Sequence, residues 1–578
     1  MQRFWNFLRL GFAFVLVAIL ALPALAQFRS SIEGTVTDQS GGVVPDALVT
    51  LTNNDTGIST SGQTNSEGLF RFPSLAPGHY QLTGTKQGFS TVKQENIILT
   101  AEEIRTVPLT LKAGMVSDTV TITAEANPIQ LSESKIGSDI SEREIRDLPL
   151  AGRNVVSVLS QTPGVTGIGN ASTNANDTDI FSLVNNPQNS ANGQRGEANA
   201  FYLDNTLATS NPDPGTYNLT PNPESVQEVH VSVNDYSAEY GRSSSIMIQA
   251  VTKSGSNDFH GSLFEYHQDN ALTAHNFFVS DVPVSRRNEF GGSLGGPILK
   301  NRIFGFFSLD KKLSSTPGVL TDQVETSDFV SFMKSNFPNN LSTQLLTAYP
   351  GTVANVTPGS VVTVQDLDPT CAGTGPLGMP CSLGLYETSN VGTSGFNNGL
   401  QWNSRVDVNF SKDRFYGNFY RKTPDVQGTN IRPKFSVVNN FAGITNYGNL
   451  DWTHTFSASL VNDAAFGVTR ISGLGVCAEC QVPSITGMGI AGFGDGFAPA
   501  EFIQNDFQWR DLLSWNRGKH AMKFGAEIFR DQENDLFSGP TERPGYVFLN
   551  GSPSGLNPIF DFAAASLWRR AKQARCTR

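Results

Sequence analysis

The stretch that decides the fold is PNPESVQEVHVSVNDYSAEYGRSSSIMIQAVTKSGSNDFHGS (221–262), together with RGEANAFYLDN (195–205). Two short runs in it, 226–233 and 245–252, alternate apolar and polar residues with the period of two that predicts β-strands. A turn-rich segment separates them. After SGSND (254–258) the pattern changes to a longer, aromatic-rich alternation that begins FHGSLFEYH. We interpret this point as the boundary between a small domain and the first strands of a membrane-spanning sheet.

The region after Phe259 continues with paired strands of about ten residues each. In QWNSRVDVNF (401–410) the apolar face carries Trp402, Val406, Val408 and Phe410, and the polar face carries Asn403, Arg405, Asp407 and Asn409. The pairs GNLDWTHTF with VNDAAFGVTRIS and FQWRDLLSW with HAMKFGAEIFRDQ repeat this design; in the last strand Met522, Phe524, Ala526 and Ile528 oppose Lys523 and Glu527. Short turns at one end and a long loop, roughly 313–399, at the other are typical of outer-membrane β-barrels.

Residues 195–262 resemble the plug-to-barrel junction of TonB-dependent outer-membrane receptors of the large Oar-like type. The resemblance implies a mainly β chain with an α+β plug and a partial antiparallel outer-membrane β-barrel, located in the outer membrane of a Gram-negative-type bacterium. The alternative is a soluble β-sandwich or propeller, although no fixed repeat favours a propeller. The expected boundaries are 1–26 for a signal peptide, 27–112 for a β-sandwich, 113–126 for a linker, 127–255 for the plug, 256–565 for an incomplete barrel with long loops, and 566–578 for an atypical tail.

Two features precede the linker. Arg3 and Arg9, the apolar run LGFAFVLVAILAL and an A-x-A site predict a signal peptide that is cleaved near Ala26. The short alternating runs SIEGTVTD and ALVTLTN predict the sandwich that follows. This segment resembles the carboxypeptidase regulatory-like domain, a transthyretin-like sandwich grouped with carbohydrate-binding-like folds. The resemblance implies a fold and not sugar binding, because a fold alone does not determine function.

The linker contains a segment that is similar to a TonB box. Such a box is an extended, β-prone strand that a TonB-type periplasmic energy-coupling protein captures by strand addition, so main-chain hydrogen bonds provide the grip. The alternative is that these residues form the last strand of the sandwich or an ordinary linker strand. The residues are Asp118, Thr119, Val120, Thr121, Ile122, Thr123 and Ala124.

The plug region opens with helix signals. Ser141-Glu142-Arg143-Glu144 fits a capping box, with Ile145 and Leu148 on the buried side of a short helix. LPLAGRNVVSVLSQTPGV (148–165) predicts a second helix, which ends before Pro163. The resemblance places five polar residues further on, at a strand and at turns, where we expect internal ion pairs and turn caps rather than ligand contacts. They are Arg195, Glu197, Asp204, Glu239 and Arg242.

Five cysteines in an exported chain favour disulfides over metal ligation. Cys371 with Cys381 and Cys477 with Cys480 are predicted to close loops, which leaves Cys576 over. No HExxH or GxSxG motif is present, so we expect no enzyme activity, no metal site and no cofactor. The net charge of −11 and the pI near 5.2 argue against a nucleic-acid partner, which requires clustered Lys and Arg.

The function that the resemblance implies is energy-coupled uptake of a large, scarce extracellular ligand of unknown identity, with a TonB-type protein and outer-membrane lipid as partners. The alternative is a surface organiser or adhesin without transport. A plugged transporter barrel takes about 22 strands, whereas the residues after the plug suffice for roughly eight to twelve. The chain also ends in SLWRRAKQARCTR, unlike an amphipathic closing strand. We therefore expect that this chain alone cannot form a closed, functional transporter.

Overall fold

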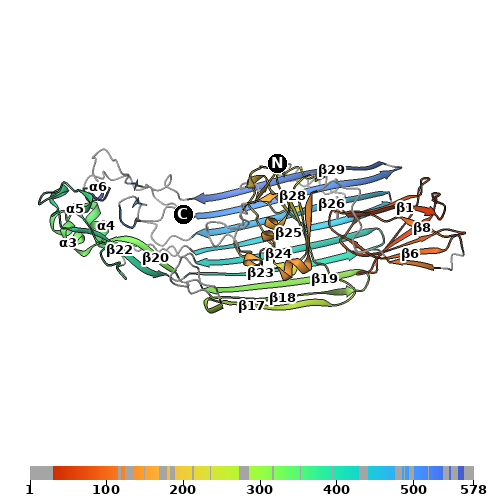
Figure 1. Cartoon of the computed structure of the whole chain (residues 1–578), viewed down its shortest axis with the longest axis horizontal. Coiled ribbons are helices and arrows are strands. Elements are labelled where there is room, and N and C mark those ends of the chain that lie inside the picture. Colours follow the sequence, from red (N-terminus) through yellow and green to blue (C-terminus); the bar gives the residue numbers. More distant parts are fainter. Residues whose placement is uncertain are drawn as a thin grey trace, which may run out of the picture.

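The computed structural model has a β-sandwich at one end, a plug and a wall of long strands in the middle, and a helical cap at the other end (Figure 1). The predicted signal peptide (1–26) and the atypical tail (566–578) lie outside the described residues. The described residues are 30–114, 119–123, 136–148, 150–167, 179–182, 189–210, 214–234, 236–237, 239–272, 286–315, 318–351, 353, 355–393, 395–427, 440–457, 459–475, 485–486, 489–493, 500–518, 520–537, 546–547 and 558–564.

The sandwich consists of two sheets that enclose an apolar core. Val49, Leu51, Tyr80 and Leu82 are buried between the sheets, and the residues that alternate with them are more exposed. This alternation confirms the expected sandwich. One sheet contains β4 (Leu69–Leu75), β1 (Ser30–Asp38), β7 (Ile104–Thr106) and β8 (Leu109–Leu111), and the other contains, in order, β3 (Ser59–Gln63), β2 (Leu48–Asn53), β5 (Gly78–Thr85), β6 (Thr91–Leu99) and β9 (Thr119–Thr123).

The plug is built on a five-stranded sheet. The two alternating runs quoted at the outset form neighbouring antiparallel strands, and 200–203 pairs in parallel with the second of them. The sheet order is β10 (Gly137–Ser141), β15 (Val226–Ser232), β16 (Met247–Thr252), β13 (Ala200–Leu203) and β14 (Thr206–Leu207); β11 (Val165–Thr166) and β12 (Ser190–Ala191) form a separate short ladder. Its core is continuous with two wall tyrosines, Tyr420 and Tyr447, so the plug packs directly on the wall.

Both predicted helices of the plug are present, with one difference. α2 (Glu142–Asp147) begins with the expected capping box between Ser141 and Glu144, and Ile145 is buried beneath it, whereas Leu148 is the half-buried C-cap. The second element, η2 (Val155–Gln161), is a 3₁₀-helix rather than an α-helix. Its β-branched valines disfavour the α-helix, and short 3₁₀ turns are common connectors. The other 3₁₀ turns of the plug are η1 (Ala151–Arg153), η3 (Gly196–Ala198) and η4 (Pro223–Ser225).

The wall is a sheet of nine long antiparallel strands in chain order. Its outermost strands, β17 and β29, do not pair with each other, so the wall is not closed within the described part of the chain. The expected hairpins are all present. The strands are β17 (His260–Asp269), β18 (Arg286–Leu299), β19 (Ile303–Ser315), β23 (Phe396–Asn409), β24 (Asp413–Gln427), β25 (Asn440–Ser457), β26 (Leu460–Gly475), β28 (Ala500–Arg517) and β29 (His520–Phe537).

The two faces of the wall have opposite character. On β23, Asn403 and Arg405 are 0% and 2% exposed, whereas Val406 is 40% exposed. The polar face points toward the plug and the apolar face points outward, as the alternation in 401–410 predicted. The GGSLGGP glycines lie within β18, where a Cβ on Gly291 would come within 2.0 Å of a carbonyl oxygen of the next strand. Close backbone packing therefore explains these glycines. The wall strands are also not buried on both faces, as the strands of a soluble core would be.

The long loop of 313–399 is more ordered than the sequence suggested. It forms most of a helical cap with its own apolar core, which residues 485–486, 489–493 and 558–564 complete. The sequence pattern missed this unit because its core joins short segments from three distant loops. The cap contains β20 (Gly318–Glu325), α3 (Ser327–Asn336), α4 (Leu341–Ala348), β21 (Val362–Thr363), α5 (Val364–Leu367), η6 (Pro376–Gly378), β22 (Gly384–Thr393), β27 (Ile485–Thr486), β30 (Tyr546–Val547) and α6 (Pro558–Ala564).

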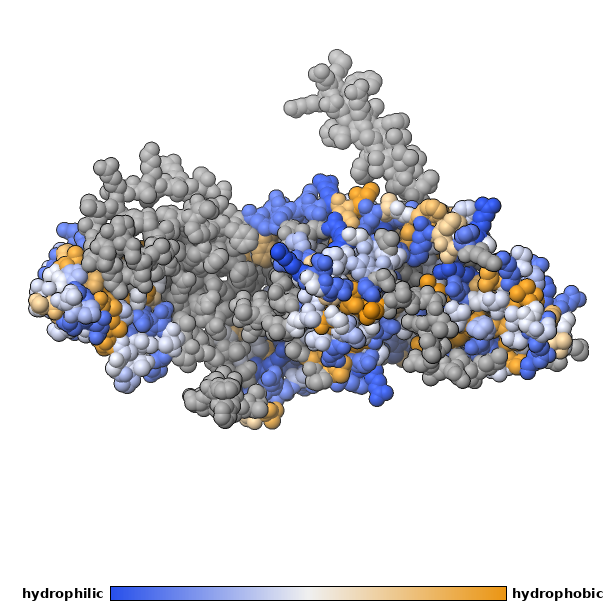
Figure 2. Space-filling view, turned by 45° about the horizontal axis from the view of Figure 1, so that its top comes forward, coloured by the Kyte–Doolittle hydropathy of each residue, from blue (hydrophilic) through white to orange (hydrophobic). Residues whose placement is uncertain are grey.

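On the face shown in Figure 2, apolar patches occur on the central body and on both end lobes. Among the described residues, every helix is too short or too polar to cross a membrane.

Candidate functional site at the coupling strand and the plug

The residues proposed from sequence as a TonB box lie in β9, which is an edge strand of the sandwich. β9 runs parallel to β6, with register partners from Thr91↔Thr119 to Glu95↔Thr123. Val120 is half-buried against the sandwich core, and Thr121 is exposed. Asp118 and Ala124 lie outside the described residues. The structure thus has the arrangement that the sequence left open as the alternative, a last strand of the sandwich. We call Thr119–Thr123 the coupling strand.

Asp204 joins the plug to the wall. It occupies the turn between β13 and β14 with φ of 45°. Its carboxylate accepts hydrogen bonds from Thr252 N (2.8 Å) and Asn418 Nδ2 (2.9 Å), and Arg405 Nη1 lies 3.5 Å away. Arg405 also donates to Asp407 through Nε (2.9 Å) and Nη2 (2.8 Å). The result is a buried charge cluster that spans the plug–wall boundary.

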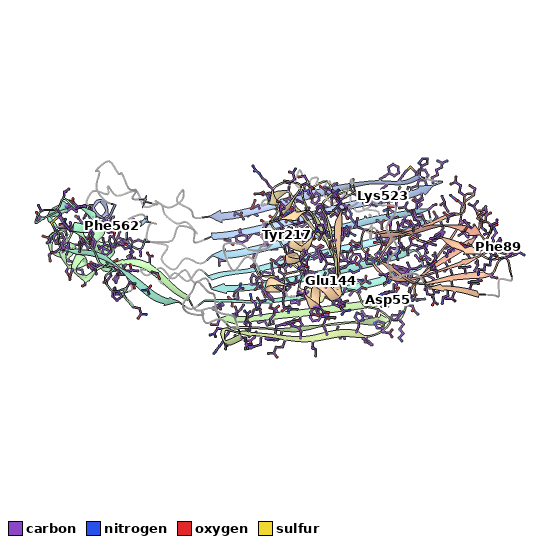
Figure 3. All side chains as sticks on the ribbon, in the orientation of Figure 1. Asp55, Phe89, Glu144, Tyr217, Lys523 and Phe562 are labelled. Atoms are coloured by element: carbon purple, nitrogen blue, oxygen red, sulfur yellow. A yellow bond between two sulfur atoms is a disulfide. The ribbon has the colours of Figure 1, made fainter. Side chains whose placement is uncertain are left out.

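Glu239 and Arg242 contact β29, the last strand of the wall. Lys523 Nζ on β29 donates to Glu239 Oε1 (2.7 Å), and the Arg242 guanidinium lies 3.9 Å from the centroid of the Phe529 ring. Figure 3 shows Lys523 on this outermost strand. Arg195 and Glu197 behave differently, because their side chains are exposed and neither forms an ion pair with a described residue. The expectation of internal ion pairs therefore does not hold for these two.

One plug–wall contact, centred on Arg153, was not predicted from the sequence. Arg153 of η1 donates to Glu289 Oε1 (2.6 Å) and Asp310 Oδ2 (2.9 Å) on the wall, and its Nη2 lies 3.5 Å from Glu224 of the plug. Its guanidinium also lies 4.2 Å from the centroid of the Phe264 ring. No sequence signal could have found this site, because its two partners on the wall, Glu289 and Asp310, each lie more than a hundred residues from Arg153 in the chain.

A second unpredicted contact lies beside it. Lys312 of β19 donates to Asp179 of the plug, and Arg287 Nη1 lies 3.5 Å from the same carboxylate. Lys422 Nζ donates to the carbonyl of Ser182 (2.5 Å). Asp179, Lys312 and Lys422 are buried, and a buried charge that loses its partner is strongly destabilising. The short segment 179–182 therefore anchors the plug to three strands of the wall.

The sandwich packs against both the plug and the wall. Ala101 N donates to the Glu228 carboxylate of β15, and Tyr240 donates to Glu102 Oε1 (2.8 Å). Ser74 Oγ donates to Asp463 Oδ2 on the wall (2.8 Å). Burial raises the pKa of Glu228 to about 8. A cavity of about 600 Å³ remains between the sandwich, the plug and the wall.

The described residues contain no group of three or more His, Cys, Asp or Glu side chains placed to hold a metal ion. Cys371 and Cys381 form a disulfide in the cap, with a Cα–Cα distance of 5.8 Å. Cys477, Cys480 and Cys576 lie outside the described residues.

Two family models match the chain. The outer membrane beta barrel domain matches residues 251–567, and the carboxypeptidase regulatory-like domain matches residues 31–112. The chain belongs to the outer-membrane β-barrel family. Its location is accordingly the outer membrane.

The chain is also similar to individual proteins. The TonB-dependent transporter Oar of Myxococcus xanthus is 29% identical over 308 residues, which cover 50% of this chain and 28% of that protein. Among solved structures, the siderophore receptor PirA of Acinetobacter baumannii is 11% identical with a TM-score of 0.42, and the outer membrane transporter YddB of Escherichia coli is 13% identical with a TM-score of 0.45; each match covers 68% of this chain and 48% of the other.

The chain thus spans less than a third of Oar and about half of the two solved chains. The matched domains and the partial match to Oar support the resemblance to an Oar-like TonB-dependent receptor.

Proposed function

We propose that this protein is a receptor that takes up a large, scarce ligand across the outer membrane with energy supplied through a TonB-type periplasmic protein. The observation that carries the proposal is a plug packed on the polar face of a barrel wall, with a β-prone strand directly ahead of it in the chain. The similarity to the TonB-dependent transporter Oar supports it. In this proposal the partner captures residues 118–124 by strand addition and pulls, which remodels the plug.

The plug–wall contacts suit a plug that must move. Many of them are hydrogen bonds and ion pairs, such as those of Arg153 and Asp204. Water can solvate these groups again when the parts separate, so the net free energy lost per contact is smaller than the gross interaction. The same contacts impose one orientation on the plug while it is seated.

We also propose that the apolar outward face of the wall meets lipid and that a working barrel contains strands beyond these nine. The strands β17 and β29 end the sheet. An unpaired strand edge in lipid leaves N–H and C=O groups without partners, at a cost of several kcal/mol for each. Closure by further strands removes this cost.

A second candidate function is a surface organiser or adhesin without transport. One observation favours it: the cap has its own apolar core and a disulfide, so it is built as a folded unit rather than as loops that close over a ligand. In this reading the cap contacts matrix or partner proteins and the plug stays seated.

Proline substitution in the coupling strand separates the two functions. Thr121→Pro removes a main-chain donor from β9, and Ser61→Pro does the same in β3, the opposite edge strand of the same sheet. The uptake proposal expects Thr121→Pro alone to abolish cross-linking to TonB in cells, with surface attachment unchanged. Equal cross-linking in both variants would remove the coupling claim. Loss of attachment on cap deletion, with growth unaffected, would favour the adhesin.

A further inference from the structure

The coupling strand is not free in this structure. It forms five register pairs with β6, and all five of its residues are β-branched, which favours the strand conformation. Val120 packs against the apolar core of the sandwich. Along the parallel ladder, part of the main-chain N–H and C=O groups of β9 point toward β6, where they are no longer available to another strand.

The geometry of the sandwich and β9 leads to a regulatory role for the sandwich. We propose that the sandwich competes with the TonB-type partner for the coupling strand, so that β9 must leave β6 before the partner can capture it. This inference rests on the proposed function, because it concerns access to the strand that the partner is proposed to grip.

The competitor has the advantage of being tethered. Only residues 112–118 separate β8, the preceding strand of the sandwich, from the coupling strand. A tether this short keeps the coupling strand near the edge of β6 at an effective concentration of order mM. A partner that binds the free strand must compete with this local concentration. Its apparent affinity therefore equals its affinity for the free strand multiplied by the fraction of molecules in which β9 is released.

The sandwich is also held in place at its end nearest the wall. β6 runs from the remote end of the sandwich, near Phe89, toward the wall, and Asp55 lies at the near end (Figure 3). The near end carries the contacts of Ala101 with Glu228 and of Ser74 with Asp463. Ala76 and Ala101 further pack with Val251 of the plug and Tyr416 of the wall. Because the sandwich is fixed on both plug and wall, the edge of β6 stays positioned for β9.

A reversible cross-link tests the competition. Lys93 and Thr121 are register partners on the outer face of the sheet, and adjacent strands lie about 4.8 Å apart, within the range for a disulfide. The variant is Lys93→Cys with Thr121→Cys, in the full chain with Cys477, Cys480 and Cys576 changed to serine. The matched control is Thr83→Cys with Lys93→Cys, which joins β5 to β6 and leaves β9 free.

The measurement is binding of a purified periplasmic domain of a TonB protein to each variant, oxidised and reduced. We expect oxidation to weaken binding at least about tenfold in the β6–β9 variant and to leave the control unchanged. Equal binding by the oxidised and reduced β6–β9 variant overturns the competition, since the partner then uses the open edge of β9 or another site. If no form binds, including the unmodified chain, the proposed capture of this strand by a TonB-type protein is wrong.

Hydrogen exchange gives a second measurement that needs no cysteine. In the unmodified chain, amides of 119–123 that bond to β6 should exchange at least about tenfold more slowly than in a peptide of the same sequence. Exchange at the peptide rate overturns the proposal, because β9 is then not held.

Discussion

The sandwich and the wall use the same period-two alternation, but they turn opposite faces inward. In β5 of the sandwich, Leu82 is buried in an apolar core while Thr83 faces outward. In β23 of the wall, Arg405 is buried against the plug while Val406 faces outward. The periodicity is identical in the two regions; what differs is the medium on each side of the sheet.

This difference shows which property of an alternating strand depends on its surroundings. An apolar face is stable wherever it avoids water, in a protein core or against lipid. A polar face is stable wherever its groups find partners, in water or in a buried network. The outward apolar face of the wall therefore supports a membrane location only together with the hydrogen-bonded interior.

Of the changes that test this comparison, removing the charge at Arg405 should lower the free energy of unfolding most. Arg405→Leu leaves the buried carboxylates of Asp204 and Asp407 without their cation, at a cost of about 3–5 kcal/mol in the free energy of unfolding. The matched change Val406→Ala, one residue along, should cost less than about 1.5 kcal/mol in lipid vesicles. Urea unfolding in vesicles measures both. Equal losses of unfolding free energy in the two variants would mean that the buried polar face does not contribute more to stability than the outward apolar face.

The mirror-image change in the sandwich comes next. Leu82→Ala removes buried methyl groups from a closed core, with an expected cost of about 3 kcal/mol, and Thr83→Ala on the outer face should cost less than about 0.5 kcal/mol. Hydrogen exchange of the sandwich strands, followed over urea concentration, reports the difference. A large effect of Thr83→Ala would contradict the inward placement of Leu82.

The cap extends the comparison to a third region, whose core, like that of the sandwich, is apolar. Reduction of the Cys371–Cys381 disulfide opens a loop with a sequence separation of 10 residues, so it should destabilise the cap by about 2.5 kcal/mol. Wall stability should not change. Thermal unfolding with and without reductant, read at the cap by hydrogen exchange, measures the effect; unfolding of the wall together with the cap would show that the two are one cooperative unit.

The docking of sandwich on plug should depend on pH through Glu228. Burial raises the pKa of this carboxyl group to about 8, so the docked state holds a proton that the free, exposed carboxyl group loses at its ordinary pKa near 4.5. Docking should therefore be strongest below about pH 4.5, weaken by at most about 1.4 kcal/mol per pH unit up to about pH 8, and stay constant above that.

Fluorescence transfer between labels on sandwich and wall follows this docking. Glu228→Gln keeps an oxygen that accepts from Ala101 N but cannot ionise, so it should abolish the pH dependence. A variant that retains the full dependence would assign the effect to another group.

Much of the architecture could be predicted because its signals are local. The capping box at Ser141, the alternation of 401–410 and the strands of 221–262 each depend on a few neighbouring residues, and each is present as predicted. The contacts of Arg153 could not be predicted. Its acidic partners, Glu289 and Asp310, lie on two wall strands, and only the seating of the plug brings them within 2.9 Å.

The sequence by itself determined the strand periodicity, the order of sandwich, plug and wall, and the presence of a β-prone segment ahead of the plug, because these depend on side-chain chemistry at short spacing. Only the tertiary structure decided which face of each strand is buried, which charges of the plug meet the wall, and that Thr119–Thr123 pairs with β6. These depend on contacts between distant segments, and such contacts form only when the whole chain has packed.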